Sequence, residues 1–434
     1  MAKNTDVSLR NAVIYSIYVR NHTAEGTFLS VIPDLDRIKT LGADIIWLMP
    51  IHPIGEKNKK GSLGCPYANK DYRTVNPAYG TMNDFCTLVD AIHARGMKCM
   101  IDVVYNHTAP DATLVSEHPE FYYRRPDGSF GNKTADWTDV IDLDYHNHDL
   151  WDYQIESLCR WAEIVDGFRC DVASLIPVQF WQKAREAVEK VRPGCIWLAE
   201  SVHGSFNVYN RICGHFAASD CELFSAFDME YEYDIREIFD RYLRGKAPLS
   251  SWLDAMNLQE AIYPDNYIKM RCLENHDQPR IASLVPDKTS LLNFTAMLFF
   301  LKGSTLLYAG QEYQCAHVPS LFEKDVFERR EEADISPFLR KLGQIKKTQL
   351  SCHDYFAAAA DDASDIAVLT RSDGKCRKIG VFSLKGRSGT VSVDLPDGTY
   401  ENCITGEPVS VQNGLLSTVG RPIILIDNGK KRLL

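Results

Sequence analysis

The sequence lacks the features of a membrane protein, a secreted protein or a nucleic-acid-binding protein. No apolar run is long enough to cross a bilayer, and the first residues, Met1 to Asp6, contain no apolar segment typical of a secretory signal. Basic residues are outnumbered, 48 against 58 acidic ones, and the net charge of −10 disfavours nucleic acid or an anionic membrane as a partner. The 13 cysteines include no CxxC pair, and several, such as Cys99 and Cys170, lie in apolar runs, as reduced buried thiols do. We therefore expect a cytoplasmic protein.

What the sequence does have is a regular alternation of two patterns. Its 434 residues are 45% hydrophobic and 24% charged, the balance of a globular enzyme with a large core. Short apolar runs alternate with amphipathic helical stretches, and helix-ending glycines such as Gly42 and Gly96 precede strands. The strand-like runs are 13–19, 44–50, 98–106, 166–173, 195–201, 225–231, 268–275 and 304–310. The helical patterns are 31–42, 82–96, 149–165, 178–191, 233–245, 291–303 and 335–348. Eight strand-like runs that alternate with helical patterns predict an α/β fold, a (β/α)8 TIM barrel, with a doubly wound open sheet as the alternative.

Two segments interrupt this alternation. Residues 108–146 follow the third strand and are polar and rich in turn residues, which is typical of an inserted binding loop or small domain. From residue 351 the pattern becomes short strands separated by turn signals, DG at 373–374 and 397–398 and NG at 413–414, which predict antiparallel hairpins and a small β-sandwich. The predicted domains are therefore a barrel over 1–107 and 147–350, an insertion over 108–146, and a sandwich over 351–434.

Polar side chains collect where the predicted strands end. In a barrel of this kind the active residues lie at the C-terminal ends of the strands. The third strand carries Asp102 and Asn106-His107, the fourth Arg169 and Asp171, the fifth Glu200, and the seventh Glu274-Asn275-His276-Asp277. Each acid alone could be a helix cap or a loop residue, and each histidine a structural one. Four strand ends that carry the same class of group are hard to explain by stability.

These residues suit hydrolysis of a glycosidic bond, which needs two carboxyl groups. Asp171 suits the nucleophile, because Arg169 lies two residues away, on the same face of the strand, and can hold it ionised. Glu200 suits the acid, since its apolar neighbours, such as Trp197, could desolvate it. His107 and His276 can donate hydrogen bonds to sugar hydroxyls, and Asp277 can stabilise positive charge at the anomeric carbon.

Four motifs in order, together with their spacing, resemble the α-amylase family of glycoside hydrolases. They are DVVYNHT (102–108), GFRCDVA (167–173), AES (199–201) and ENHDQPR (274–280), and VIDLDY (140–145) is similar to a weaker fifth signature. The resemblance covers nearly the whole chain. It implies a barrel, an inserted B domain after strand three and a C-terminal antiparallel β-sandwich. It also implies that Asp171 is the nucleophile, Glu200 the acid/base and Asp277 the transition-state stabiliser.

The resemblance implies substrate contacts as well. Arg169, His107, His276 and Asp102 would contact the sugar or the nucleophile, and Tyr67 in PYANKDY (66–72) would stack on the sugar at the cleaved position. Tyr67 as a packing aromatic is the alternative. Here Pro66 replaces a glycine that is frequent in the family. Ser174 and Leu175 stand where many members have a Lys-His or similar polar pair, which puts strong leaving-group-side binding in doubt.

A calcium ion is the only cofactor that the resemblance suggests, and the chemistry does not need it. Calcium requires several oxygen ligands. Asn106 and Asp142 correspond to frequent family ligands of a Ca²⁺ between the barrel and the B domain, but Leu175 stands at another ligand position. The segment after the first strand, VRNHTAEGTF (19–28), also lacks the Asp-rich loop of some relatives. A turn hydrogen bond and a loop acid are the alternatives for Asn106 and Asp142.

The leading hypothesis is a retaining glycosidase that acts on α-1,4-linked glucans or maltooligosaccharides through a covalent glycosyl-enzyme intermediate. The alternative is an α-glucan or sucrose-type glucosyltransferase or phosphorylase of the same family. A non-catalytic carbohydrate-binding or transporter-associated protein would have lost a carboxylate or gained a membrane anchor, and neither is seen. Preferred chain length, α-1,4 against α-1,6 linkage and oligomeric state stay open.

Overall fold

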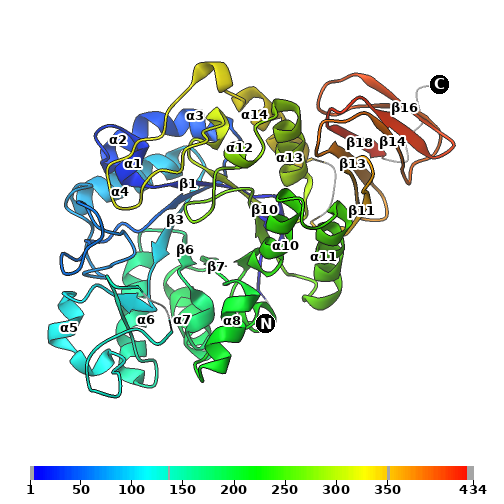
Figure 1. Cartoon of the computed structure of the whole chain (residues 1–434). Helices are drawn as coiled ribbons and strands as arrows, with labels where there is room; N and C mark the ends of the chain where they lie inside the picture. The colour runs from blue at the N-terminus through cyan, green and yellow to red at the C-terminus, as the bar shows by residue number, and fades with distance from the viewer. Residues whose placement is uncertain (1–3, 135–136, 349–351, 428–434) are drawn as a thin grey trace. The chain divides into compact units, whose positions relative to one another are not determined.

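The computed structural model describes residues 4–134, 137–348 and 352–427. Eight parallel strands form a closed barrel in the order β1-β10-β9-β8-β7-β6-β3-β2 (Figure 1). The predicted barrel is thereby confirmed, and the open doubly wound sheet is excluded. The barrel strands are β1 Val13–Ile17, β2 Ile45–Leu48, β3 Lys98–Val103, β6 Gly167–Cys170, β7 Ile196–Ala199, β8 Met229–Tyr231, β9 Lys269–Arg271 and β10 Ser304–Tyr308. Except for Lys98, every residue in them is buried, which explains their continuous apolar runs.

The helices between these strands follow the predicted helical stretches. They include α3 Leu35–Thr40, α4 Met82–Ala94, α6 His148–Ala162, α7 Val178–Val191, α10 Tyr233–Leu243, α13 Lys288–Phe300 and α14 Ser336–Lys346. A capping box between Thr81 and Asp84 starts α4. Gly42 and Gly96 adopt φ of 96° and 65°, the left-handed geometry that ends a helix before the next strand. Among the described residues, no helix is both long and apolar enough to span a membrane.

Two of the longer helices were not indicated by the sequence pattern. They are α8 Gly204–Ile212 and α11 Leu249–Ile262. The sequence of α8, GSFNVYNRI, contains glycine and asparagine, which are weak helix formers. Apolar residues are distributed around α11 without a clear stripe, and this helix packs against β11 Tyr355–Asp361. The remaining short helices are α1 Val19–His22, α2 Phe28–Val31, α5 Thr113–Glu117, α9 Asp220–Leu223 and α12 Ile281–Leu284.

The chain forms two compact units, residues 1–5, 14–234 and 318–328, and residues 6–13, 235–317 and 329–434. The first unit contains the inserted domain that was predicted after the third strand. Its two short strands, β4 His107–Thr108 and β5 Ile141–Asp142, pair antiparallel with His107 opposite Asp142. The insertion is thus tied back to the end of β3, and it brings Asp142 close to the motif at 102–108.

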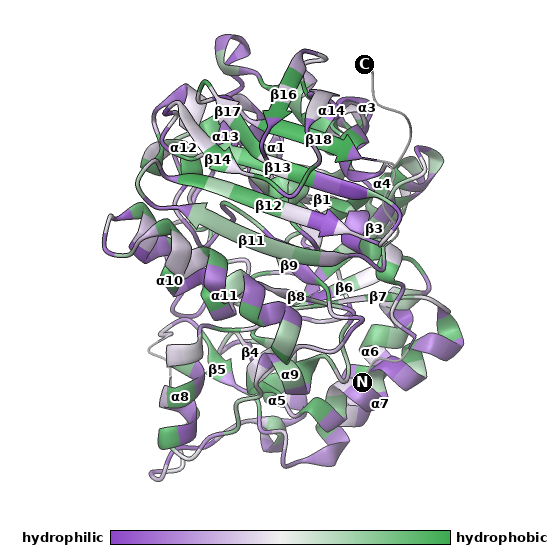
Figure 2. Ribbon diagram, turned by 90° about the vertical axis from the view of Figure 1, so that its right-hand side faces the viewer, coloured by the Kyte–Doolittle hydropathy of each residue, from purple (hydrophilic) through white to green (hydrophobic). Residues whose placement is uncertain are grey.

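The second unit contains the predicted antiparallel sandwich. Its sheets have the orders β11-β12-β13-β18 and β14-β17-β16-β15 (Figure 1, orange to red). The further strands are β12 Ile366–Ser372, β13 Arg377–Ser383, β14 Gly389–Ser392, β15 Gly398–Glu401, β16 Pro408–Gln412, β17 Leu415–Thr418 and β18 Ile423–Asp427. Apolar side chains such as Ile379 and Leu416 fill the space between the sheets, and Figure 2 shows apolar residues along β12 and β13.

The sandwich differs from the sequence prediction in three details. No strand was predicted at β11, whose sequence YFAAAAD has few β-formers, or at β17. The NG turn is confirmed as a two-residue hairpin between β16 and β17. The predicted hairpin at DG 397–398 is wrong, because β14 and β15 are not neighbours in their sheet; Asp397 instead accepts hydrogen bonds from the N–H groups of Asn413 and Gly414. The predicted boundary at 350–351 lies outside the described residues.

Candidate active site

One buried guanidinium connects three carboxylates at the ends of three barrel strands. Nη1 of Arg169 lies 2.9 Å from Oδ1 of Asp102 and 2.7 Å from Oδ1 of Asp171, and Nη2 lies 3.0 Å from Oε2 of Glu200. Arg169 and Asp102 are fully buried, whereas Asp171 and Glu200 keep 6% and 7% of their surface exposed. Burial opposes the charge of Arg169, but Asp102 and Glu200 outweigh it and raise the pKa of the guanidinium well above its ordinary value. The predicted residues Asp102, Arg169, Asp171 and Glu200 therefore form one cluster.

The backbone after Asp171 contacts the other catalytic candidate. Val172 has φ 37° and ψ 43°, a left-handed conformation that is unfavourable for a β-branched residue. In this conformation its N–H donates a 2.8 Å hydrogen bond to Oε2 of Glu200. The strained turn thus links the residue next to Asp171 directly to Glu200.

Three aromatic side chains surround Arg169. The ring centroids of Trp47, Tyr231 and Tyr67 lie 5.2, 5.3 and 5.7 Å from its guanidinium carbon. Nε of Arg169 donates to the Tyr231 hydroxyl at 3.1 Å, and the Tyr67 hydroxyl donates to Oδ2 of Asp102 at 3.1 Å. Tyr67 thus lies beside the cluster, and its stacking on the sugar stays an expectation from the family resemblance. Trp47 and Tyr231 were missed; Tyr231 ends β8, so its position at a strand end was the available signal.

His107 lies in β4, which follows β3 and pairs with β5 of the insertion. It is buried, and its ring centroid is 5.3 Å from that of Trp137. Nδ2 of Asn106 lies 3.2 Å from Nδ1 of His107, where the amide can donate to the imidazole. Burial lowers the pKa of His107 in spite of the nearby carboxylates of Asp142 and Asp139, so the neutral ring is favoured at neutral pH.

The motif that follows β9 belongs to the second unit. His276 is buried, with Nε2 3.0 Å from Oδ2 of Asp277, while the Asp277 side chain is 41% exposed. The N–H of Asp277 donates to Oδ1 of Asn275 at 2.9 Å. Glu274 pairs with Arg280 at 2.6 Å and accepts the N–H of Ile281 at 2.7 Å. Within this unit, then, Asp277 is accessible and Glu274 is engaged in a buried pair.

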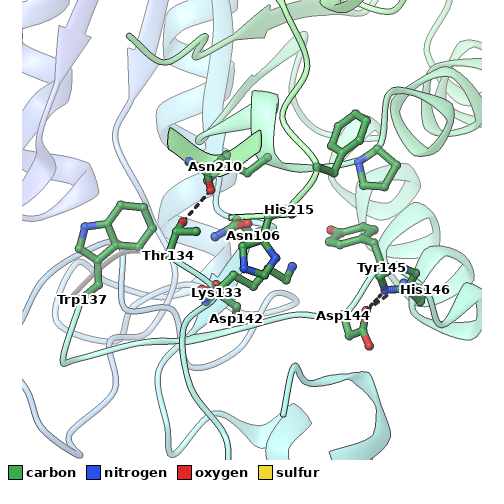
Figure 3. A pocket seen from close by; sticks show the side chains of 14 residues that line it. Asn106, Lys133, Thr134, Trp137, Asp142, Asp144, Tyr145, His146, Asn210 and His215 are labelled. Atoms are coloured by element: carbon green, nitrogen blue, oxygen red, sulfur yellow. Dashed lines mark hydrogen bonds and ion pairs between the residues drawn. The ribbon is translucent and has the colours of Figure 1, made fainter. Parts of the chain in front are cut away.

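A cavity of about 230 Å³ lies in the first unit, between the insertion and the segments after Asp171 and Glu200 (Figure 3). Thr134 of the insertion donates a 2.6 Å hydrogen bond to Oδ1 of Asn210 in α8. This hydrogen bond links two walls of the cavity. The lining is Asn106, Lys133, Thr134, Trp137, Asp142, Asp144, Tyr145, His146, Leu175, Pro177, Asn210, Gly214, His215 and Phe216. Leu175, at the position of the expected polar pair, therefore borders a cavity that takes its polar groups from other segments.

The residues expected to hold calcium do not fit a divalent cation. Oδ2 of Asp142 accepts the N–H of Lys133 at 2.7 Å, and Oδ1 lies 3.3 Å from Nδ2 of Asn132. The Lys133 ammonium donates to the carbonyl of Leu143 at 2.8 Å, next to Asp142. Burial lowers the pKa of Lys133, and the carboxylates of Asp142 and Asp144 act in the opposite direction. Among the described residues, no group of three or more His, Cys, Asp or Glu side chains could hold a metal ion.

A closed eight-stranded barrel with carboxylates at the ends of neighbouring strands is the arrangement in which barrel enzymes place their active sites. Among such enzymes, the chain belongs to the α-amylase family. The family model "Alpha amylase, catalytic domain" matches residues 14–348, and "Bacterial Alpha amylase C-terminal domain" matches residues 358–425.

Relatives of known structure support this assignment over nearly the whole chain. An α-amylase from Lactobacillus plantarum is 44% identical with a TM-score of 0.93, covering 97% of this chain and 100% of that one. A noncanonic maltogenic α-amylase from Thermotoga neapolitana is 32% identical with a TM-score of 0.85, covering 96% and 99%. Among curated proteins, an α-1,4-glucan:maltose-1-phosphate maltosyltransferase from Rhodospirillum rubrum is 34% identical over 215 residues. That match covers 44% of this chain and 31% of the maltosyltransferase, so the chain corresponds to a minor part of this relative.

Proposed function

We propose that the protein hydrolyses α-1,4-glucosidic bonds in maltooligosaccharides and related short glucans, with retention of configuration. The observation that carries this proposal is the contact of one guanidinium with both Asp171 and Glu200. A retaining glycosidase needs one carboxyl group as nucleophile and a second, a short distance away, as acid and then base. A shared arginine fixes both groups in one geometry.

In the first step, Asp171 attacks the anomeric carbon and Glu200 gives its proton to the departing glycosidic oxygen. A C–O bond to Asp171 forms as the bond to the leaving sugar breaks, which yields a covalent β-linked glycosyl-enzyme. Arg169 holds Oδ1 of Asp171, which favours its ionised form. Tyr67 would stack on the sugar at the cleaved position.

In the second step, Glu200 takes a proton from water, whose oxygen attacks the anomeric carbon and releases Asp171. The two inversions restore the α configuration. Asp277, exposed at the end of the segment after β9, would stabilise the positive charge of both transition states. His276 and the neutral His107 would donate hydrogen bonds to sugar hydroxyls.

The cavity beside the insertion supports a preference for sugar units beyond the cleaved bond. It is bordered by residues that follow Asp171 and Glu200, and it offers amide, hydroxyl and aromatic groups from Asn210, Thr134 and Trp137. Carbohydrate sites combine such polar groups with aromatic faces. These groups would replace the polar pair whose place Ser174 and Leu175 occupy.

Glucosyl transfer is the second candidate, and the similarity to a maltosyltransferase favours it. Both reactions use the same intermediate and differ in the acceptor, water or a sugar or phosphate oxygen. Neither needs a cofactor. A cytoplasmic location is supported by the 13 free cysteines.

The test is to incubate the protein with maltoheptaose, pullulan and sucrose, with and without phosphate. Products and their anomeric form are followed by NMR, with Asp171→Asn as the control. Short α-configured products that the variant does not release would support hydrolysis. Products longer than the substrate, or a sugar phosphate, would assign transfer or phosphorolysis, and β-configured products would contradict the retaining mechanism.

A further inference from the structure

The inserted segment is attached to the end of β3 through a short stretch around Asp142. The N–H of Leu143 donates to the carbonyl of Asn106 at 2.9 Å, and the N–H of Asp142 donates to the carbonyl of Gly131 at 3.0 Å. Asp142 also pairs with His107 in the register of β4 and β5. A charged group beside Asp142 can therefore stabilise or destabilise the junction between the insertion and β3.

Lys133 supplies such a charge. It is the only lysine between residues 108 and 146, and it contacts this junction twice. Its N–H donates to the carboxylate of Asp142, and its ammonium donates to the carbonyl of Leu143 at 2.8 Å. Figure 3 shows Lys133 grouped with Asn106, Asp142 and His215 at the cavity. Burial lowers the pKa of its ammonium, and the carboxylates of Asp142 and Asp144 oppose this shift.

The other contacts of Asp142 also act against a metal ion. To bind one, its carboxylate would have to give up hydrogen bonds from Lys133 and Asn132 or share its oxygens with them. A divalent cation would in addition lie close to a fixed ammonium and be repelled by it. A lysine ammonium has three donors and one positive charge, which suit a carbonyl and neighbouring carboxylates.

We propose that the Lys133 ammonium is a built-in cation that holds the insertion on the end of β3, so that the fold needs no calcium there. This inference is independent of the reaction proposed above. It concerns the stability of the insertion, which carries Trp137 against His107 and forms one wall of the cavity.

The first measurement uses the unmodified protein. Its melting temperature and its resistance to proteolysis within 108–146 are recorded after treatment with EDTA, and then with calcium added up to millimolar concentrations. Calcium binding is measured in parallel by equilibrium dialysis. We expect the same melting temperature in both conditions and no stoichiometric binding. A clear rise in melting temperature with calcium, together with one bound ion per chain, would overturn the proposal.

The second measurement replaces the charge. Lys133→Met keeps the length and apolar stem of the side chain but removes the ammonium, and Lys57→Met is the control at an exposed lysine. We expect Lys133→Met to melt on the order of 3 °C lower and to be cleaved faster within the insertion, and the control to be unchanged. An unchanged Lys133→Met would contradict the proposal.

A double-mutant cycle separates the charge from general disruption, also if Lys133→Met folds poorly. Asp142→Asn removes the negative partner, and the cycle compares the two single variants with Lys133→Met/Asp142→Asn. We expect the double variant to melt at a clearly higher temperature than the sum of the two single shifts predicts. Additive shifts would show that the ammonium and Asp142 do not act together, and would overturn the proposal. If Lys133→Met yields no folded protein, Lys133→Gln takes its place in the cycle. Lys133→Arg keeps the positive charge and is expected to retain most of the melting temperature; a Lys133→Arg variant that melts as low as Lys133→Gln would overturn the proposal.

Discussion

Two buried arginines have different charge environments. Arg280, in the second unit, faces one carboxylate, that of Glu274, and also donates to the carbonyl of Ala309 at 2.7 Å. Arg169, in the first unit, faces three carboxylates, of which two keep some exposure. The first pair is balanced in charge, whereas the second cluster has more negative than positive groups.

This difference separates a structural role from a chemical one. Removing one partner of a balanced buried pair is strongly destabilising, because it leaves an uncompensated buried charge. In a cluster with more carboxylates than guanidinium groups, the negative charges repel one another and lower the stability of the fold. Functional sites retain such arrangements because activity depends on them. The contrast predicts that removing one carboxylate has opposite consequences in the two places.

The largest expected effect is on stability. Glu274→Gln should destabilise the protein by about 3–5 kcal/mol, because it leaves the buried Arg280 without its charged partner. Asp171→Asn should leave the free energy of unfolding unchanged or raise it by about 1 kcal/mol, since two carboxylates then share one guanidinium. Denaturant unfolding of both variants measures this. If Asp171→Asn destabilises the protein as much as Glu274→Gln does, the Arg169 cluster is an ordinary structural network. The proposed difference between the two arginine environments would then be wrong.

A buried histidine that belongs to neither group, His52, extends the comparison. Nδ1–H of His52 donates a hydrogen bond to the Thr74 carbonyl at 2.9 Å, and burial lowers the pKa of His52 to about 4. The unfolded chain, with a histidine pKa of about 6.5, binds a proton in the window between these values while the folded chain does not. Stability should therefore fall as the pH drops from about 6.5 to 4, by about 3 kcal/mol from this residue.

The measurement is the free energy of unfolding against pH for the parent and for His52→Gln. We expect a flatter slope for the variant across this window. The exposed His317 serves as a control through His317→Gln, which should keep the parent's slope. Equal slopes for the parent and His52→Gln would show that another group is responsible.

A smaller effect is expected from the support of Arg169. Tyr231→Phe removes the hydroxyl that accepts from Nε, a hydrogen bond to a charged donor, and should lower kcat roughly 10-fold with little change in KM. Tyr400→Phe, whose hydroxyl contacts Pro396 in the C-terminal sheet, is the matched control. Steady-state kinetics with maltoheptaose measures both variants. A Tyr231→Phe variant as active as the control would show that the Tyr231 hydroxyl does not support Arg169 in catalysis.

Much of the fold could be predicted from the sequence, because it depends on local patterns of apolar and polar residues. The barrel strands are continuous apolar runs, and α7 begins and ends where its amphipathic stretch does. Asp102, Arg169, Asp171 and Glu200 could be grouped because parallel strands place their C-terminal ends together. Tyr67 was identified only through the family resemblance.

The features that could not be predicted from the sequence depend on contacts between distant segments. Lys133 lies in an insertion without periodicity, so nothing in its sequence indicates that its ammonium meets the carbonyl of Leu143. The left-handed conformation of Val172 is unusual for valine and is imposed by the turn after β6. The strand at β11 was missed because alanines fit a helix as well as a strand, and α11 packing on it decides the outcome.

The central claim is that Asp171 forms a covalent bond to the sugar and that Glu200 acts as acid and then base. The most direct test incubates Glu200→Gln with α-maltosyl fluoride. Fluoride can leave without protonation, so Asp171 can still be glycosylated, while the loss of the base slows release of the sugar. We predict that mass spectrometry finds a maltosyl adduct on the peptide that contains Asp171, and none in Asp171→Asn/Glu200→Gln. An adduct on another residue, or rapid fluoride release by Glu200→Gln with no adduct, would contradict the account.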